Sequence, residues 1–299
     1  AAPAAGARHH FDADEKADSI VSEEVDGVDT VVSWSDEDAG HQAAMPVTVN
    51  DIGTKKTDGG DDMVLGRPTV VANMLNGRRG ISLGRWRNVA ELKQGLGAGS
   101  SDLVYVSLRA GGGTLGRDGD FREGFAVVRF RAQDLYYAFG TDCNAQNMHN
   151  MGSDPKWAHP DALGASVSWN GVPYDLQSGL KSHLNEFGVL RFACGDAQPI
   201  GSIGLDRYTP GSLGGLDICE YITYDRILTD RERIDTEAYL MKKWLNAEHP
   251  LDVRSEASVA FGADADAELT VDDDVTLRGV TTETDSFVKR GAAKLTANV

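Results

Sequence analysis

The sequence predicts an all-β fold, a β-sandwich with one helix packed on it near the C-terminal end. Short runs rich in β-branched and aromatic residues recur along the chain, separated by turns that contain Gly, Asp or Asn. In runs such as residues 125–131 and 187–193, arginine alternates with apolar residues, which places one strand face in a core and the other toward water. Only one stretch of the chain has a convincing helical spacing.

The strands follow in order from Val28–Trp34, a mixture of β-branched and aromatic residues that suits a half-buried strand. Asn170-Gly171 lies between two strand-like runs, and this dipeptide tolerates the two positive φ angles of a type I′ hairpin. The remaining strands are expected at 68–71, 80–83, 103–109, 125–131, 136–139, 165–169, 187–193, 199–203 and 217–224.

The helix is expected over residues 229–247. Thr229 and Glu232 form a capping box, in which each side chain satisfies a backbone amide of the first turn. An apolar stripe follows at helical spacing, and Pro250 ends the run; the stripe consists of Ile234, Ala238, Met241 and Leu245, flanked by Tyr239 and Trp244. A single amphipathic helix must bury this stripe against the sandwich. Trp34, Trp169 and Trp244 are assigned to the core.

The composition changes after Pro250, which divides the chain into a sandwich domain, 1–250, and a small β extension, 251–299. The second part has no Trp, Tyr or Cys and repeats short Val- and Thr-rich pieces between Asp- and Gly-containing turns. Short rungs of this kind suggest the first coils of a β-solenoid that would stack on more chain.

Composition excludes several classes of partner. The 299 residues carry 29 Lys+Arg against 46 Asp+Glu, a net charge of −17. Nucleic acids and anionic membrane surfaces need clustered basic residues, so neither is an expected partner. No run of about 18 apolar residues predicts a membrane-spanning helix. Three cysteines without metal-finger spacing allow at most one disulfide, and Cys194 and Cys219, in apolar runs, are read as buried thiols, their pairing left open.

Three segments resemble the bacterial laminin-G-like domains of the concanavalin A-like lectin/glucanase superfamily. They are 10–14 with 32–36, 67–83, and 203–244 with its Tyr224-Asp225-Arg226 turn and Lys243-Trp244 end. The resemblance covers about residues 8–248 and implies a jelly-roll sandwich. The chain departs from the family in its Asp- and Gly-rich 36–66 insertion and in the loop that begins Gly111-Gly112-Gly113.

A shorter resemblance lies in the extension. Residues 287–296 look like the Lys-x-Gly-x-Gly-x-Leu-Thr rung of autotransporter passenger β-helices, with Ala293 in place of the second Gly. It implies that the chain is part of a longer exported bacterial protein, located outside the cell or at its surface.

The sequence shows no complete catalytic constellation. A retaining glucanase needs two carboxylates about 5 to 5.5 Å apart. The nearest candidate is Asp217 with Glu220, but a separation of three places two strand residues on opposite faces. The resemblance also implies that Glu220 is a structural acid. No Gly-x-Ser-x-Gly or phosphate-binding motif is present, and His41, His149, His159 and His183 lie in polar stretches.

Two polar segments are candidate binding sites. A sugar site needs an aromatic platform and polar partners for the hydroxyls, and the segment 141–157 offers Asp142, Asn144, Gln146, Asn147, His149, Asn150 and Trp157. Calcium prefers several carboxylate, amide and carbonyl oxygens on turns. Such oxygens are offered by Asp58, Asp61 and Asp62, and also by Asp142 with Asn144, Asn147 and Asn150.

These observations lead to one expected function and two alternatives. The chain is expected to be a non-catalytic carbohydrate-recognition or adhesion module, with a glycan or a surface protein as partner and Ca²⁺ as a candidate cofactor. A structural spacer or self-assembling surface subunit is the first alternative, because unpaired strand edges can template other chains. A glycoside hydrolase with carboxylates from separate loops is the second.

Overall fold

The computed structural model describes the chain as a mostly antiparallel β-protein. The described residues are 2–25, 27–37, 43–46, 68–83, 108–109, 120–130, 137–140, 148–151, 154–155, 166–174, 183, 185–199, 202–203, 216–252 and six short strands between 258 and 297. Within these ranges, helix is confined to α3 (Asp230–Leu240) and the π-helical turn η1 (Met241–Leu245) that continues it. The predicted all-β class is confirmed.

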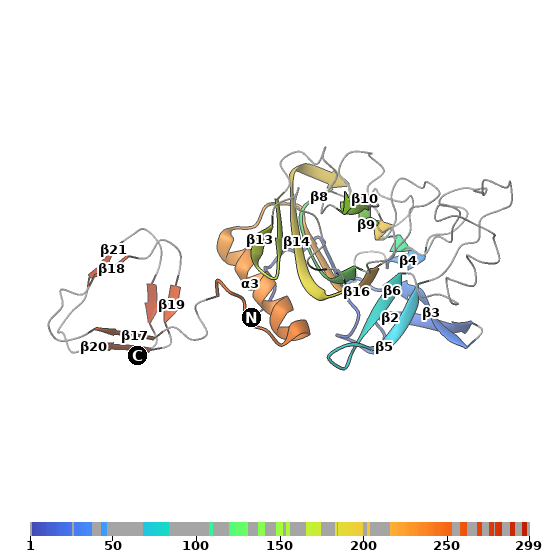
Figure 1. Cartoon of the computed structure of the whole chain (residues 1–299), viewed down its shortest axis with the longest axis horizontal. Coiled ribbons are helices and arrows are strands. Elements are labelled where there is room, and N and C mark those ends of the chain that lie inside the picture. The colour runs from blue at the N-terminus through green and yellow to red at the C-terminus, as the bar shows by residue number, and fades with distance from the viewer. Residues whose placement is uncertain are drawn as a thin grey trace.

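A large antiparallel sheet forms the centre of the structure (Figure 1). Its N-terminal strand, β1 (His9–Asp12), pairs with β16, on the side that β16 shares with β6. The other strands follow in the order β13 (Val172–Tyr174), β12 (Ser166–Trp169), β14 (Phe187–Pro199), β8 (Asp120–Phe130), β16 (Leu216–Tyr224), β6 (Arg78–Leu83), β5 (Thr69–Leu75), β3 (Val28–Trp34) and β2 (Ile20–Val25).

A smaller antiparallel sheet covers one face of the large sheet. Ile203 of the small sheet belongs to a buried apolar cluster with Phe11, Trp34 and Leu190 of the large one, so the two sheets share a core. Trp34 and Trp169 are buried in this cluster, as expected. The strand order of the small sheet is β11 (Asp154–Pro155), β10 (Met148–Met151), β9 (Tyr137–Gly140), β15 (Ser202–Ile203), β7 (Leu108–Arg109) and β4 (Met45–Pro46).

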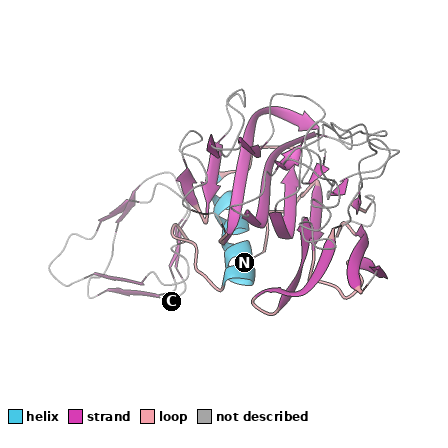
Figure 2. Cartoon of the chain, turned by 45° about the vertical axis from the view of Figure 1, so that its right-hand side comes forward, coloured by secondary structure: helices cyan, strands magenta, loops and turns pink. Residues whose placement is uncertain are grey.

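Helix α3 covers the opposite face of the large sheet (Figure 2). A second buried cluster joins Phe125 and Ile222 of the strands to Leu240, Met241 and Trp244. The predicted capping box is present: the Thr229 side chain accepts from the Glu232 amide, and the Glu232 carboxylate accepts from the Thr229 amide at 2.9 Å. The helical segment spans 230–245, close to the predicted 229–247. The wider η1 turn contributes the fully buried Trp244.

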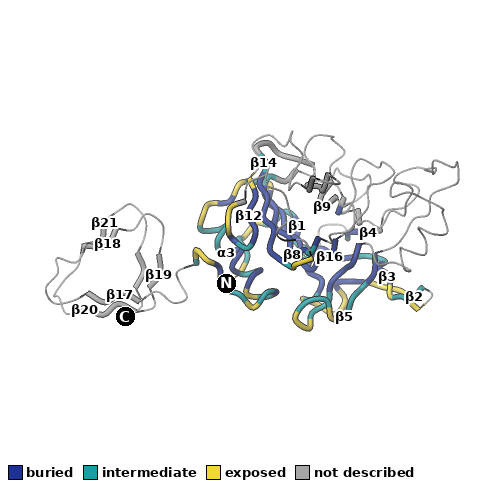
Figure 3. Tube along the Cα trace, in the orientation of Figure 1, coloured by how far each residue is buried: buried dark blue, intermediate teal, exposed yellow. Residues whose placement is uncertain are grey.

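A β-bulge in β16 decides which residues face the helix. The pairing of β16 with β8 shifts between Ile218 and Glu220, which leaves Cys219 as the extra residue. Before and after the bulge, Ile218 and Tyr221 face the core between the sheets, whereas Cys219 and Ile222 face the helix. The bulge therefore reverses the alternation of side chains along the strand. All of β16 is buried (Figure 3).

The bulge corrects one expectation from the sequence. Asp217 pairs with Arg129, whose guanidinium lies over the ring of Phe187 on the helix side, and Glu220 contacts Trp244 on the same side. Both carboxylates therefore face the helix, and the prediction that they lie on opposite faces is wrong. Cys219 and Cys194 are free thiols that pack against different clusters, so the sheet itself separates them.

The predicted strands and hairpin appear where the residue pattern is strongest. β3 has the predicted bounds, Val28–Trp34. The Asn170-Gly171 turn joins β12 and β13 with φ angles of 51° and 76°, as the type I′ prediction requires.

The extension consists of short strands that pair in parallel with one another. Ser258 pairs with Gly279, Glu268 with Val288 and Val275 with Leu295, so the pairing repeats at about 20 residues. None of these six strands pairs with either larger sheet in the described part of the chain, and they lie beside the main body in both views (Figures 1 and 2). They are β17 (Ser258–Phe261), β18 (Glu268–Thr270), β19 (Val275–Leu277), β20 (Gly279–Thr282), β21 (Val288–Arg290) and β22 (Leu295–Ala297).

Candidate functional site

The predicted binding residues fall mostly outside the described residues. Asp58, Asp61 and Asp62 of the first calcium candidate do so, as do Asp142, Asn144, Gln146, Asn147 and Trp157 of the sugar candidate. His149 and Asn150 stand on β10. Because β9 and β10 are antiparallel neighbours, residues 141–147 connect two adjacent strands at one end of the small sheet.

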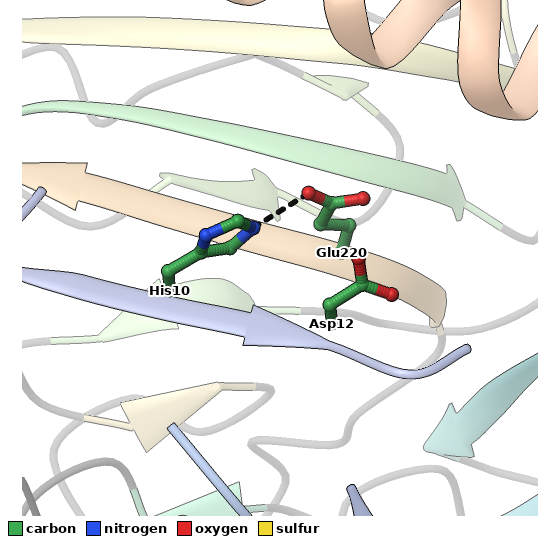
Figure 4. A group of neighbouring side chains, drawn as sticks. All are labelled: His10, Asp12 and Glu220. Carbon is green, nitrogen blue, oxygen red and sulfur yellow. Dashed lines mark hydrogen bonds and ion pairs between the residues drawn. The ribbon is translucent and has the colours of Figure 1, made fainter. Parts of the chain in front are cut away.

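A different group of polar side chains lies on the helix side of the large sheet (Figure 4). His10 and Asp12 stand on β1, and Glu220 stands opposite Asp12 on β16. Phe11, between His10 and Asp12, belongs to the inter-sheet core, so strand alternation turns its two neighbours toward the helix. Lys243 reaches the same place from η1. We name His10, Asp12, Glu220 and Lys243 the ionic cluster.

Glu220 is the hub of the ionic cluster. Its Oε1 lies 2.7 Å from His10 Nε2. Its Oε2 accepts a 2.5 Å hydrogen bond from Trp244 Nε1 and lies 3.0 Å from Lys243 Nζ. Lys243 Nζ also donates to Asp12 Oδ2 and, at 3.0 Å, to the hydroxyl of Tyr239. The ammonium thus lies between the two carboxylates.

Burial and opposite charges compete in setting the pKa values of the cluster. Burial raises the pKa of Asp12 to about 6 and the nearby Glu220 charge adds to this, although Lys243 opposes both. Burial also acts to raise the pKa of Glu220, but the bond from His10 and the charge of Lys243 outweigh it and lower that pKa. For His10, burial lowers the pKa, but the hydrogen bond and charge of Glu220 raise it above its usual value. Ionised Glu220 therefore favours a protonated His10.

The ionic cluster has the side chains of a metal site but already holds a cation. His10, Asp12 and Glu220 each offer a ligand atom, and these atoms lie within 4.8 Å of one another. One nitrogen and two carboxylates would suit zinc. The carboxylate oxygens are already engaged, however: Asp12 Oδ1 accepts the amides of Asp14 and Glu15, and Oδ2 accepts from Lys243. A metal ion would have to displace the ammonium.

A second buried group joins β12, α3 and the segment after η1. Ser168 Oγ donates to Glu237 Oε1, and His249 Nε2 lies 2.9 Å from Glu237 Oε2. On the other side of the ring, the Leu251 amide donates to His249 Nδ1 at 3.0 Å. An Nδ1 that accepts carries no proton, so the Nε2–H donates to Glu237 and the ring is neutral. We name Ser168, Glu237 and His249 the neutral cluster.

The neutral cluster contains the residue types of a hydrolase triad in the wrong order. In a serine hydrolase, histidine lies between the serine and the acid so that it can take the hydroxyl proton. Here Glu237 lies between Ser168 and His249. All three residues are also buried. The group cannot activate Ser168 as a nucleophile, and it serves to fasten the chain after η1 to the sheet.

All buried acids of the described residues are paired in a similar way. Six are buried, and each lies against a basic side chain. The pairs are Asp12 with Lys243, Asp36 with His9, Glu123 with Arg191, Asp217 with Arg129, Glu220 with His10 and Lys243, and Glu237 with His249. Their carboxylates are neutralised or hydrogen-bonded inside the protein.

Sequence reasoning named the members of the ionic cluster without bringing them together. His10 and Asp12 lie in the first of the segments that carry the laminin-G-like resemblance, and Glu220 and Lys243 both lie in the third. Glu220 and Lys243 interact with residues more than 200 positions earlier in the chain, which no local pattern encodes. The available signal was the coincidence of charged residues within otherwise apolar strand and helix patterns.

Comparison with known proteins identifies no relative. No protein-family model matches the chain, and no match is found among curated proteins or solved structures. Within the described ranges, no helix is both long and apolar enough to cross a membrane.

Proposed function

We propose that the chain is a non-catalytic recognition module of an exported or surface-displayed bacterial protein, which binds carbohydrate through one end of a laminin-G-like, concanavalin A-like jelly-roll sandwich. The observation that carries the non-catalytic part of the proposal is the pairing of all six buried acids of the described residues with basic side chains. A glycosidase needs one protonated and one ionised carboxyl group open to substrate.

The architecture supports the recognition part of the proposal. Two antiparallel sheets with a common core make a rigid scaffold, and binding residues in such scaffolds concentrate on the connecting segments. Residues 141–147 connect β9 to β10 and supply amide and carboxylate side chains, and Trp157 follows β11. An aromatic ring with several amides is the combination that recognises a sugar.

Calcium is proposed as a cofactor of the connecting segments rather than of the core. Asp58, Asp61 and Asp62 supply oxygens in one segment, and Asp142 with nearby asparagines supplies them in another. The ionic cluster is not part of this proposal, because it carries its own ammonium.

A glycan array on the purified chain, run with millimolar Ca²⁺ and again with EDTA, tests the proposal. We expect saturable binding that is lost in N144A/N147A and in W157A, while W244F, a core control, keeps it if folded. Loss of binding in EDTA and in D61N/D62N would assign the calcium to its segment. Silence of the wild type in both conditions contradicts carbohydrate recognition. Release of reducing sugar that a carboxylate substitution abolishes contradicts the non-catalytic assignment.

One observation favours a second function, a spacer or self-assembling subunit. The extension pairs only with itself, in parallel, at a repeat of about 20 residues. Stacked rungs of this kind leave unpaired edges that other rungs can join. Light scattering against protein concentration separates the two functions: growth of assemblies that residues 1–252 alone do not form favours the spacer.

A further inference from the structure

The ionic cluster combines the ligand set of a transition-metal site with a lysine. His10 Nε2, one Asp12 oxygen and one Glu220 oxygen lie within 4.8 Å of one another. Histidine nitrogen with two carboxylates is a set that holds zinc in a three-ligand arrangement, with water as the fourth ligand. No other group of at least three such residues in the described part of the chain meets this spacing.

Lys243 lies between two of these three ligand groups. Its Nζ contacts Asp12 Oδ2 and lies 3.0 Å from Glu220 Oε2, so one cation bridges the two carboxylates. Its side chain is only 10 % exposed, and the two acids are essentially buried. Tyr239 and Trp244 complete the enclosure, each ring about 5 Å from Nζ.

The balance of charge supports the same reading. Asp12 and Glu220 face the ammonium of Lys243 in a largely buried site. A divalent ion added beside Lys243 would bring three positive charges against two carboxylates, which is unfavourable in a buried site. The lysine and a metal ion are therefore mutually exclusive.

We infer that Lys243 is a built-in cation that takes the place of a metal ion, and that removing it converts His10, Asp12 and Glu220 into a zinc site. The inference is independent of carbohydrate binding. It predicts that the core of the module neither needs nor binds a divalent metal, so any effect of EDTA on ligand binding arises elsewhere.

Zinc titration followed by thermal unfolding tests the inference at pH 8, where protons compete least with the metal. For the wild type we expect that any change in melting temperature with Zn²⁺ or EDTA is the same in Glu220→Gln. Lys243→Ala should melt at a lower temperature without metal and gain about 5 to 10 °C with Zn²⁺ at a hundred times its Kd. Lys242→Ala, which removes the neighbouring exposed lysine, should behave as the wild type.

Two further measurements assign the metal to the cluster. Lys243→Ala/Glu220→Gln lacks one ligand and should lose the zinc response. Co²⁺ added to Lys243→Ala should give the visible absorption spectrum that is typical of an ion with a low coordination number. Co²⁺ added to the wild type should not.

Two results would overturn the inference. The first is stoichiometric zinc binding by the wild type that Glu220→Gln abolishes. The second is a folded Lys243→Ala that does not respond to zinc. If Lys243→Ala does not fold, Lys243→Met, which keeps most of the side-chain stem, replaces it. Failure of both variants to fold with or without Zn²⁺ also counts against the inference, because the ligand set would then be unable to use a metal.

Discussion

The histidine–glutamate pairs His10–Glu220 and His249–Glu237 have similar contact distances and opposite electrostatics. His10 lies 2.7 Å from Glu220 and His249 lies 2.9 Å from Glu237. Around His10, the charges of Glu220, Asp12 and Glu37 raise the pKa against the effect of burial. Around His249, the Leu251 amide donates to Nδ1 and thereby excludes a proton from it. The charge state of a buried histidine is thus decided by all its neighbours and not by its nearest carboxylate.

Replacing the hub of the ionic cluster should have the largest effect on stability. In Glu220→Gln, protonated His10 loses its closest counter-charge, and Lys243 keeps Asp12 but loses the second carboxylate beside it. We expect a loss of about 3 to 5 kcal/mol in the free energy of unfolding, the usual cost of breaking a buried ion pair from one side. Urea unfolding followed by tryptophan fluorescence measures it. A loss below about 1 kcal/mol would mean that the cluster is solvated in solution.

Gly171, in the turn that lies against His249, is expected to be the next most sensitive position to substitution. A Cβ on Gly171 would lie 2.3 Å from His249 Nε2, and its φ of +76° is unfavourable for other residues. Gly77 has a φ of +82° with nothing within 4 Å. We expect Gly77→Ala to cost about 1 kcal/mol from backbone conformation alone, and Gly171→Ala about 2 to 3 kcal/mol.

A double-mutant cycle isolates the contact between the turn and the ring. If the extra cost of Gly171→Ala comes from His249, then adding His249→Ala should recover most of it. Equal losses for Gly171→Ala and Gly77→Ala in urea unfolding would show that the ring moves aside freely.

Replacing the acid of the neutral cluster should cost less than replacing that of the ionic cluster. Glu237→Gln leaves Ser168 and a neutral His249 with a hydrogen-bonding partner and strands no buried cation. We expect a loss of about 1 to 2 kcal/mol, typical of an impaired buried hydrogen bond. Guanidinium unfolding of this variant beside Glu220→Gln makes the comparison direct. If Glu237→Gln is the more destabilising of the two, then the assigned charge states are reversed.

The smallest effect is expected in the pH dependence. A raised pKa in the folded protein means that protonated His10 stabilises the fold fully below about pH 6.5, the usual histidine value, and that this contribution is lost as the pH rises through the folded pKa. The free energy of unfolding of the wild type should therefore exceed that of His10→Gln most at pH 6 and least at pH 9. Ionisation of Asp12 also destabilises the fold as the pH rises to its pKa of about 6. The wild type and His10→Gln should therefore be compared with each other at each pH, from pH 6 upward. A difference that grows with pH contradicts the assignment.

Local patterns in the sequence were sufficient to predict the elements that depend on neighbouring residues. Val28–Trp34, the Asn170-Gly171 hairpin and the capping box at Thr229 each rest on a few adjacent side chains, and the structure confirms all three. The all-β class follows from the number of such runs. The jelly-roll family, the ligand and the location outside the cell remain proposals, because they rest on resemblance.

Features that depend on pairing between distant strands could not be predicted. The bulge at Cys219 arises from how β16 pairs with β8, and it turns Glu220 toward the helix against the alternation of the sequence. β1 was not predicted as a strand because its four residues, two of them histidines, have little intrinsic preference to signal one. The ionic cluster could not be predicted because it depends on both the bulge and β1. The predicted sugar and calcium residues remain predictions, since most lie outside the described residues.

The pairing of β1 with β16 has a consequence for how the protein is made. β1 is synthesised more than 200 residues before its partner strand and Lys243. During translation, His10 and Asp12 are therefore present before Lys243 and Glu220, their partners in the folded protein, have been synthesised. Contacts of such long range slow folding. We expect the closing step to occur after Lys243 has left the ribosome, so that a chain arrested before this point exposes the apolar face that helix α3 later covers.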